Sequence, residues 1–274
     1  MRCCVMHGAG NSFVVIELPR GENDTGEDLS VLALRLCAHF GVDGLIAVRP
    51  GVPGADLGML FYNADGSRGE MCGNGARCLA RYGVEHGLAP DPEDIRILAT
   101  AGLVRARRIT REQYEVRLND PSVIDLCCEA PVPGGTERCA YVELGEPGIP
   151  HTVVEVGPEA FEELDALRER GRALRCSPAF PRGANVSFVC PTGESSVRAI
   201  TYERGVEDFT RACGTGCGAI ALTQILRGRL PDGPVTIAMP GGELRVALRR
   251  TGDTATDILL TGPTAVVEEG NYEP

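Results

Sequence analysis

Hydrophobic residues recur at helical spacing in a few long stretches of this chain and alternate with polar residues in many short ones. Leu32, Leu36 and Phe40 share one face of a helix predicted over residues 29–40, which Gly41 should end. The pattern predicts a charged amphipathic helix over residues 161–174. Alternating or β-branched runs predict strands over residues 3–6, 11–17, 45–48, 59–63, 95–100, 103–109, 114–118, 141–144, 152–156, 185–190, 197–202, 235–238, 243–248, 257–261 and 264–267. Residues 20–28, 50–58 and 64–69 are predicted loops.

One local pattern occurs twice, 141 residues apart in a chain of 274. Residues 72–75 read Cys-Gly-Asn-Gly and residues 213–216 read Cys-Gly-Thr-Gly. Each follows a predicted strand and loop and leads into an apolar helical pattern. The second helix is apolar on nearly all sides, so it should be buried. We therefore expect a mixed α/β (α+β) fold of two similar domains related by internal duplication, each a mostly antiparallel or mixed sheet rolled around a central buried helix.

Composition narrows the classes of function. The net charge of −11 argues against a phosphate backbone and an anionic membrane surface, so we expect neither a nucleic-acid nor a membrane partner. No run of about 18 apolar residues is present. Residues 1–7 are too short for a signal peptide, so the expected compartment is the cytoplasm. The 12 cysteines are then expected to be free thiols, a few of them catalytic.

A cysteine at a glycine-rich helix start has chemical consequences. The free N–H groups of the first turn carry partial positive charge, so the thiolate is favoured and its pKa should be lowered. The same groups bind a carboxylate or a phosphate. If both helix starts face one amino-acid carboxylate, the α carbon lies between two sulfurs. One thiolate then removes the α proton, the opposite thiol protonates the other face, and the centre inverts without a metal or an organic cofactor.

The chain resembles the cofactor-independent diaminopimelate epimerases over almost its whole length. The resemblance rests on residues 7–11 (HGAGN), 61–67 (FYNADGS), 71–78 (MCGNGARC), 150–151 (PH), 184–185 (AN), 202–205 (YERG), 212–216 (ACGTG), 240–242 (PGG) and 261–263 (TGP). It implies an isomerase that converts LL-2,6-diaminopimelate to the meso form, a precursor of lysine and peptidoglycan, with no cofactor, as a homodimer. It also implies that a C-terminal strand returns to the first domain, which gives domains of residues 1–118 plus 264–274 and 119–263.

The same resemblance assigns roles to single residues. Cys72 and Cys213 would be the two catalytic bases, and His151 and Glu203 would tune their pKa values. No metal ligand is implied. The expected contacts to substrate come from Asn11, Asn63, Gly73, Asn74, Asn185, Glu203, Arg204, Gly214 and Thr215.

Three positions depart from the commonest family pattern. Ser12 stands where Asp is frequent, and Gly44 stands where some members carry a Gln that contacts the substrate. Ile149 stands where Asn is usual and removes an expected side-chain contact. A racemase of another amino acid, of the proline or histidine type, therefore remains an alternative on the same scaffold.

Two further alternatives use the same cysteines differently. A thiol redox protein would use Cys72 and Cys213 as a redox pair, and a binding module would not need them for ligand affinity. Zinc is disfavoured, because Cys72-x5-Cys78 and Cys213-x3-Cys217 do not match the usual ligand spacing. The other cysteines are expected to pack as small hydrophobic residues.

Overall fold

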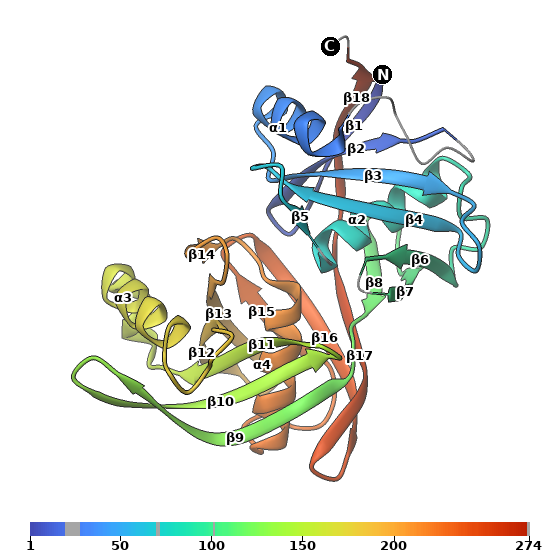
Figure 1. The fold of residues 1–274 in the computed structure, drawn as a ribbon. Helices are drawn as coiled ribbons and strands as arrows, with labels where there is room; N and C mark the ends of the chain where they lie inside the picture. Colours follow the sequence, from blue (N-terminus) through green and yellow to red (C-terminus); the bar gives the residue numbers. More distant parts are fainter. Residues whose placement is uncertain (20–27, 70–71, 101, 273–274) are drawn as a thin grey trace. The chain divides into compact units, whose positions relative to one another are not determined.

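The computed structural model describes residues 1–19, 28–69, 72–100 and 102–272 (Figure 1). The chain forms two compact units, Met1–Arg117 with Thr261–Pro274 (unit 1) and Leu118–Leu260 (unit 2). The loop predicted over residues 20–28 lies outside the described residues except for Asp28, and so do Glu70 and Met71 before the first cysteine motif.

Unit 1 is built from one sheet and the helices α1 and α2. Its elements are β1 (Arg2–Gly8), β2 (Asn11–Glu17), α1 (Leu29–Phe40), β3 (Gly44–Pro50), β4 (Leu57–Asn63), β5 (Arg68–Gly69), α2 (Gly73–Glu85), β6 (Ile95–Ala99), β7 (Gly102–Arg108), β8 (Gln113–Arg117) and β18 (Ala265–Asn271). Pairing gives the order β18–β1–β2–β3–β4–β6–β7–β8, and β5 pairs with β4. The pairs β2–β3 and β4–β6 are parallel, because α1 and α2 cross between their strands.

The two helices of unit 1 differ in their surroundings. Every residue of α2 from Gly73 to Gly83 is buried, and the helix contacts strands across the sheet (Figure 1). By contrast, α1 buries one face against β2, β3 and β4 and leaves Val31 and Leu34 exposed. Its ends follow local rules, since the Asp28 carboxylate accepts the Ser30 N–H and Gly41 closes the helix at φ 65°.

Unit 2 repeats this plan. Its elements are β9 (Pro121–Val132), β10 (Gly135–Gly145), β11 (Gly148–Glu155), the 3-10 helix η1 (Pro158–Glu162), α3 (Leu164–Arg175), β12 (Asn185–Gly193), β13 (Ser196–Glu203), β14 (Asp208–Thr210), α4 (Gly214–Leu226), β15 (Val235–Met239), β16 (Gly242–Thr251) and β17 (Thr254–Pro263), whose last residues belong to unit 1. The order β9–β10–β11–β12–β13–β15–β16 contains two parallel pairs, β11–β12 and β13–β15. Here α4 is the enclosed helix and α3 covers a second core (Figure 1).

The two units match element by element. In unit 1 the series β1, β2, α1, β3, β4, β5, α2, β6, β7 has the same pairings, parallel and antiparallel, as β10, β11, α3, β12, β13, β14, α4, β15, β16 in unit 2. The predicted fold class, two similar mixed sheets around one buried helix each, is confirmed. Cys72 and Cys213 hold equivalent positions in this repeat.

The structure differs from the sequence prediction at one helix and at three strands, β5, β9 and β14, that were not predicted. The helix predicted over residues 161–174 is interrupted at Glu163, where η1 ends and α3 begins. The strand β9 begins at a proline and has Pro131 near its end, which argues against a strand, although less exposed and exposed residues alternate from Ile124 to Val132. Among the described helices, none has the length and apolar content needed to cross a membrane.

Candidate active site

Cys72 is the N-cap of α2. Its backbone is extended (φ −133°, ψ 111°), and its Sγ accepts the N–H of Gly75 at 3.4 Å. The thiol is half-buried, whereas the residues that follow it in the helix are buried. This places a sulfur where the free N–H groups of the first helical turn point.

Cys213 is the N-cap of α4 with nearly the same backbone geometry (φ −119°, ψ 106°). It is more deeply buried than Cys72, at 5% exposure. Its Sγ lies 3.8 Å from the Thr215 hydroxyl. A Cβ at Gly216 would approach that sulfur to 3.2 Å, so only glycine leaves the thiol unobstructed there.

The protonation of Cys213 differs from the expectation drawn from its helix position. Burial raises the pKa of the Cys213 thiol well above its ordinary value, and the negative charge of Glu203 adds to this. Hydrogen bonds from the Gly216 N–H and the Thr215 hydroxyl oppose the rise but do not outweigh it. The prediction of a lowered pKa is therefore wrong for Cys213, because loss of hydration exceeds the effect of the helix start.

Two titratable groups of unit 2 have shifted pKa values. Glu203, at the end of β13, has a raised pKa because it is buried, although a hydrogen bond with Thr210 partly offsets the rise. His151 on β11 is fully buried, and neither ring nitrogen has a hydrogen-bond partner among the described residues. Burial, with a smaller contribution from the charge of Arg204, lowers the pKa of His151 to about 3. The imidazole is therefore neutral at physiological pH.

Asn185 links the polar groups around β12. It pairs with His151 in the parallel register of β11 and β12. Its Oδ1 accepts the backbone N–H of Arg204 at 2.8 Å, and its Nδ2 donates to the carbonyl of Pro150 at 3.2 Å. The Arg204 guanidinium donates to the carbonyl of Arg182, a contact that no sequence signal indicated.

Three asparagines of unit 1 lie at the ends of its elements: Asn11 is the first residue of β2, Asn63 is the last residue of β4, and Asn74 lies in the first turn of α2. Asn74 Nδ2 donates to Asn11 Oδ1 at 2.5 Å. Asn63 ends β4, and its Nδ2 donates to the Ser67 hydroxyl at 2.9 Å. Register pairing makes Asn63 the counterpart of Glu203 in unit 2, so the two halves share geometry but not charge.

The three unusual positions have different surroundings. The Ser12 hydroxyl and N–H both donate to the Asp43 carboxylate, at 3.0 and 2.8 Å. A Cβ at Gly44 would lie 2.7 Å from the Phe61 ring, so a residue larger than glycine fits there only if that ring moves. Ile149 is half-buried on β11, opposite Leu144.

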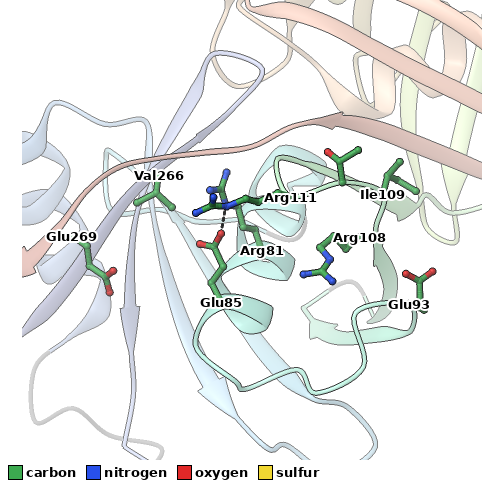
Figure 2. Close-up of a pocket in the computed structure, with 9 residues that line it drawn as sticks. Arg81, Glu85, Glu93, Arg108, Ile109, Arg111, Val266 and Glu269 are labelled. Atoms are coloured by element: carbon green, nitrogen blue, oxygen red, sulfur yellow. Dashed lines mark hydrogen bonds and ion pairs between the residues drawn. The ribbon is translucent and has the colours of Figure 1, made fainter.

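A recess of about 790 Å³ in unit 1 contains none of the predicted site residues (Figure 2). Its walls carry three arginines and three glutamates, Arg81, Arg108, Arg111, Glu85, Glu93 and Glu269. These charges balance, and Arg81 is already held by Glu85 at 3.0 Å. Within the described ranges, no group of three or more His, Cys, Asp or Glu side chains is arranged to hold a metal ion.

Sequence comparison matches the chain to a single protein family over most of its length. The family model described as diaminopimelate epimerase matches residues 3–122 and 145–267. A diaminopimelate epimerase of Aquifex aeolicus is 35% identical over 276 residues, which covers 97% of this chain and 95% of the relative. One of Caldanaerobacter subterraneus subsp. tengcongensis is 35% identical over 292 residues and is matched over the full length of both chains.

Solved structures share the fold at much lower identity. A probable proline racemase from Agrobacterium radiobacter K84 aligns with a TM-score of 0.72 and 20% identity, covering 99% of this chain and 92% of that one. A PhzF-family phenazine biosynthesis protein of Bacillus anthracis aligns with a TM-score of 0.74 and 14% identity, covering 98% of both chains. At such identities the likeness concerns the fold alone.

Proposed function

The chain belongs to the diaminopimelate epimerase family, an isomerase family, and from this premise we propose that it converts LL-2,6-diaminopimelate to the meso isomer. The observation that carries the proposal is the pair of N-cap cysteines. Cys72 and Cys213 begin equivalent helices of the two repeated units with the same extended backbone. A reaction that needs one proton acceptor and one proton donor on opposite faces of a carbon needs such a pair.

The chemistry is a proton exchange at the α carbon. One cysteine, as thiolate, takes the α proton, and the other, as thiol, gives a proton to the opposite face, so atoms and charge balance without a cofactor. The negative charge that spreads into the substrate carboxylate is stabilised by backbone N–H groups at the two helix starts, from Gly73, Asn74, Gly214 and Thr215.

The raised pKa of Cys213 assigns the resting protonation states in this proposal. Cys213 is the thiol, and Cys72, which is half-buried and accepts the Gly75 N–H, is the thiolate. Burial, and after it the charge of Glu203, keep Cys213 protonated, and His151, held neutral, adds no opposing positive charge. The reverse reaction starts from the opposite protonation states.

The remaining polar residues bind the end of the substrate that is distant from the reacting carbon. Asn63, Asn185 and Arg204 bind the distal amino and carboxylate groups, and Asn11 contributes an amide N–H. The fixed orientation of Asn185, through the N–H of Arg204, supports this role, because a binding amide must present a defined donor and acceptor.

The competing function is a racemase of another amino acid, and the residue at position 149 favours it. Ile149 offers no polar side chain where an Asn contact is usual, so the hold on the distal end of diaminopimelate is weaker than in most family members. Its substitution Ile149→Asn separates the two functions. Activity on LL-diaminopimelate should rise in this variant, while activity on proline- or histidine-type substrates should not.

We also propose a homodimer formed along β18. This strand pairs with β1 but with no second strand of the described chain, and Val267 on it is 61% exposed. An open edge with an apolar side chain favours pairing with another copy. Light scattering should give twice the monomer mass, and a monomeric mass at micromolar concentration would contradict the dimer.

The test of function is exchange of the α hydrogen in heavy water. Without added pyridoxal phosphate or metal, deuterium should enter diaminopimelate, and chiral chromatography should show the LL and meso isomers approaching equilibrium. Cys72→Ala and Cys213→Ala should each abolish inversion, whereas Cys176→Ala, an exposed thiol, is the matched control. Thiol-dependent peroxide consumption without α exchange would instead identify a redox protein.

A further inference from the structure

Arg77 is a fully buried arginine on the helix that Cys72 begins. Its exposure is 0%, and its Nη2 donates to Asn74 Oδ1 at 2.9 Å, one turn earlier in α2. Burying a guanidinium is costly unless hydrogen bonds compensate for the lost hydration. An apolar side chain would fill the same space without this cost, which suggests that the guanidinium has a role beyond packing.

The bond from Arg77 determines which way the Asn74 amide faces. A guanidinium has only donors, so the Asn74 atom that faces it must be the oxygen. The amide nitrogen of Asn74 then turns toward Asn11, whose Oδ1 accepts it at 2.5 Å. The Asn11 amide is thereby oriented as well, and its Nδ2, a donor, is the atom turned away from Asn74.

The fold brings these residues together at one point. Asn11 begins β2 directly after the turn Ala9-Gly10, where both residues have positive φ (53° and 89°). A Cβ on Gly8 would lie 3.1 Å from the Asn74 carbonyl oxygen and 3.5 Å from Arg77 Nη2. Because position 8 is glycine, the β1–β2 turn packs closely against the first turn of α2.

The duplicated unit lacks all three residues. The register of the repeat places Ile149 at the position of Asn11, Thr215 at that of Asn74 and Gly218 at that of Arg77. Yet α4 forms an enclosed helix of the same length as α2. The fold therefore does not require the guanidinium and the two amides, which points to a role in the Cys72 half alone.

We propose that Arg77 is a positioning residue that orients the side-chain amides of Asn74 and Asn11 so that Asn11 presents an N–H to the substrate carboxylate. This rests on the proposed function, in which Asn11 and Asn74 lie at the substrate. Arg77 is a buried donor with a permanent charge. Through the hydrogen bonds Arg77–Asn74 and Asn74–Asn11 it fixes the orientation of an amide at the site.

Two variants test the orientation from opposite sides. Arg77→Met removes the donor but keeps an unbranched side chain in the core, so position 77 then does not fix which way the Asn74 amide faces. In Asn74→Asp, the carboxylate still accepts from Arg77 but offers only an acceptor to Asn11, so the Asn11 amide must reverse and face the ligand with its oxygen. Both variants should raise KM for diaminopimelate roughly 10- to 100-fold with a smaller change in kcat.

The matched control is Arg81→Met on the same helix. Arg81 is also buried, but its guanidinium donates to Glu85 and to the Thr264 carbonyl, whereas Arg77 donates to Asn74. It should lower thermal stability and leave KM unchanged. A folded Arg77→Met enzyme with wild-type KM, or an equal rise of KM in Arg81→Met, would overturn the proposal.

A second measurement separates this inference from the proposed function. The side-chain ¹⁵N–¹H₂ signals of Asn11 and Asn74, identified by their loss in Asn11→Asp and Asn74→Asp, should move and exchange faster with water in Arg77→Met. If they do so in a protein that inverts no amino acid, the orientation by Arg77 stands and the proposed function fails. Signals that are unchanged in Arg77→Met refute the orientation whatever the activity.

Discussion

The buried imidazole of His151 should make the stability of the protein fall as the pH is lowered from 7. In the unfolded chain a histidine takes up a proton near pH 6.5. In the folded protein the pKa of His151 is lowered to about 3, first by burial and then by the charge of Arg204. Between these values the unfolded state binds one proton more than the folded state, so the stability is complete above pH 6.5 and is lost toward pH 3.

The size of this effect follows from the same pKa difference. At pH 5 the unfolded state gains about 2 kcal/mol from protonation of this one group, since each pH unit below 6.5 contributes about 1.4 kcal/mol. The variant His151→Gln removes the titration. The difference in unfolding free energy between pH 7 and pH 5 should therefore shrink by about 2 kcal/mol relative to wild type.

Urea denaturation followed by far-ultraviolet circular dichroism measures this, because the chain has no tryptophan for fluorescence. Comparing each protein with itself at two pH values cancels the packing cost of glutamine, which is the same at both. The control for loss of a surface histidine is His39→Gln, since His39 is exposed on α1. An unchanged pH dependence in His151→Gln would refute a neutral buried imidazole at this position.

Three further predictions follow from local geometry. Gly216→Ala should lower turnover about 10-fold or more without unfolding the protein, because its Cβ would lie 3.2 Å from the Cys213 sulfur; wild-type turnover would contradict the crowding. Alkylation of Cys213 by iodoacetamide should still be accelerating at pH 9, since its raised pKa keeps the thiol protonated, and a plateau near pH 7 in peptide mass mapping would disprove this. Asp28→Ala should lower the unfolding free energy by about 1 kcal/mol in urea denaturation through loss of the cap on Ser30, whereas Asp28→Asn should stay near wild type.

Much of the fold was accessible from local patterns in the chain. The helix predicted over residues 29–40 coincides with α1, because the spacing of Leu32 and Leu36 and the stop at Gly41 act within a few residues of one another. The two Cys-Gly-x-Gly motifs indicated two equivalent helix starts, and both cysteines are N-caps. The strand β9 was missed although its residues alternate from Ile124 to Val132, because the prolines near its two ends argue against a strand, and pairing with β10 holds it in the sheet.

The chemical state of the site was decided by residues far apart in sequence. The helix start at Cys213 predicted a lowered pKa, but the surroundings that bury the thiol, together with Glu203, raise it. His151 is neutral because the sheet and the helices around it exclude water and offer its ring no partner. The order Arg77–Asn74–Asn11 likewise exists only because Gly8 lets a strand turn approach α2.

The amino-acid sequence by itself thus determined the repeated cysteine motifs and most helices and strands, since caps, turns and apolar periodicity act over a few residues. Only the tertiary structure decided which groups lose their water and which way an amide faces. Hydration and amide orientation depend on what packs around a side chain, and Arg204 beside His151 and Asn11 beside Asn74 come from segments far away in the sequence.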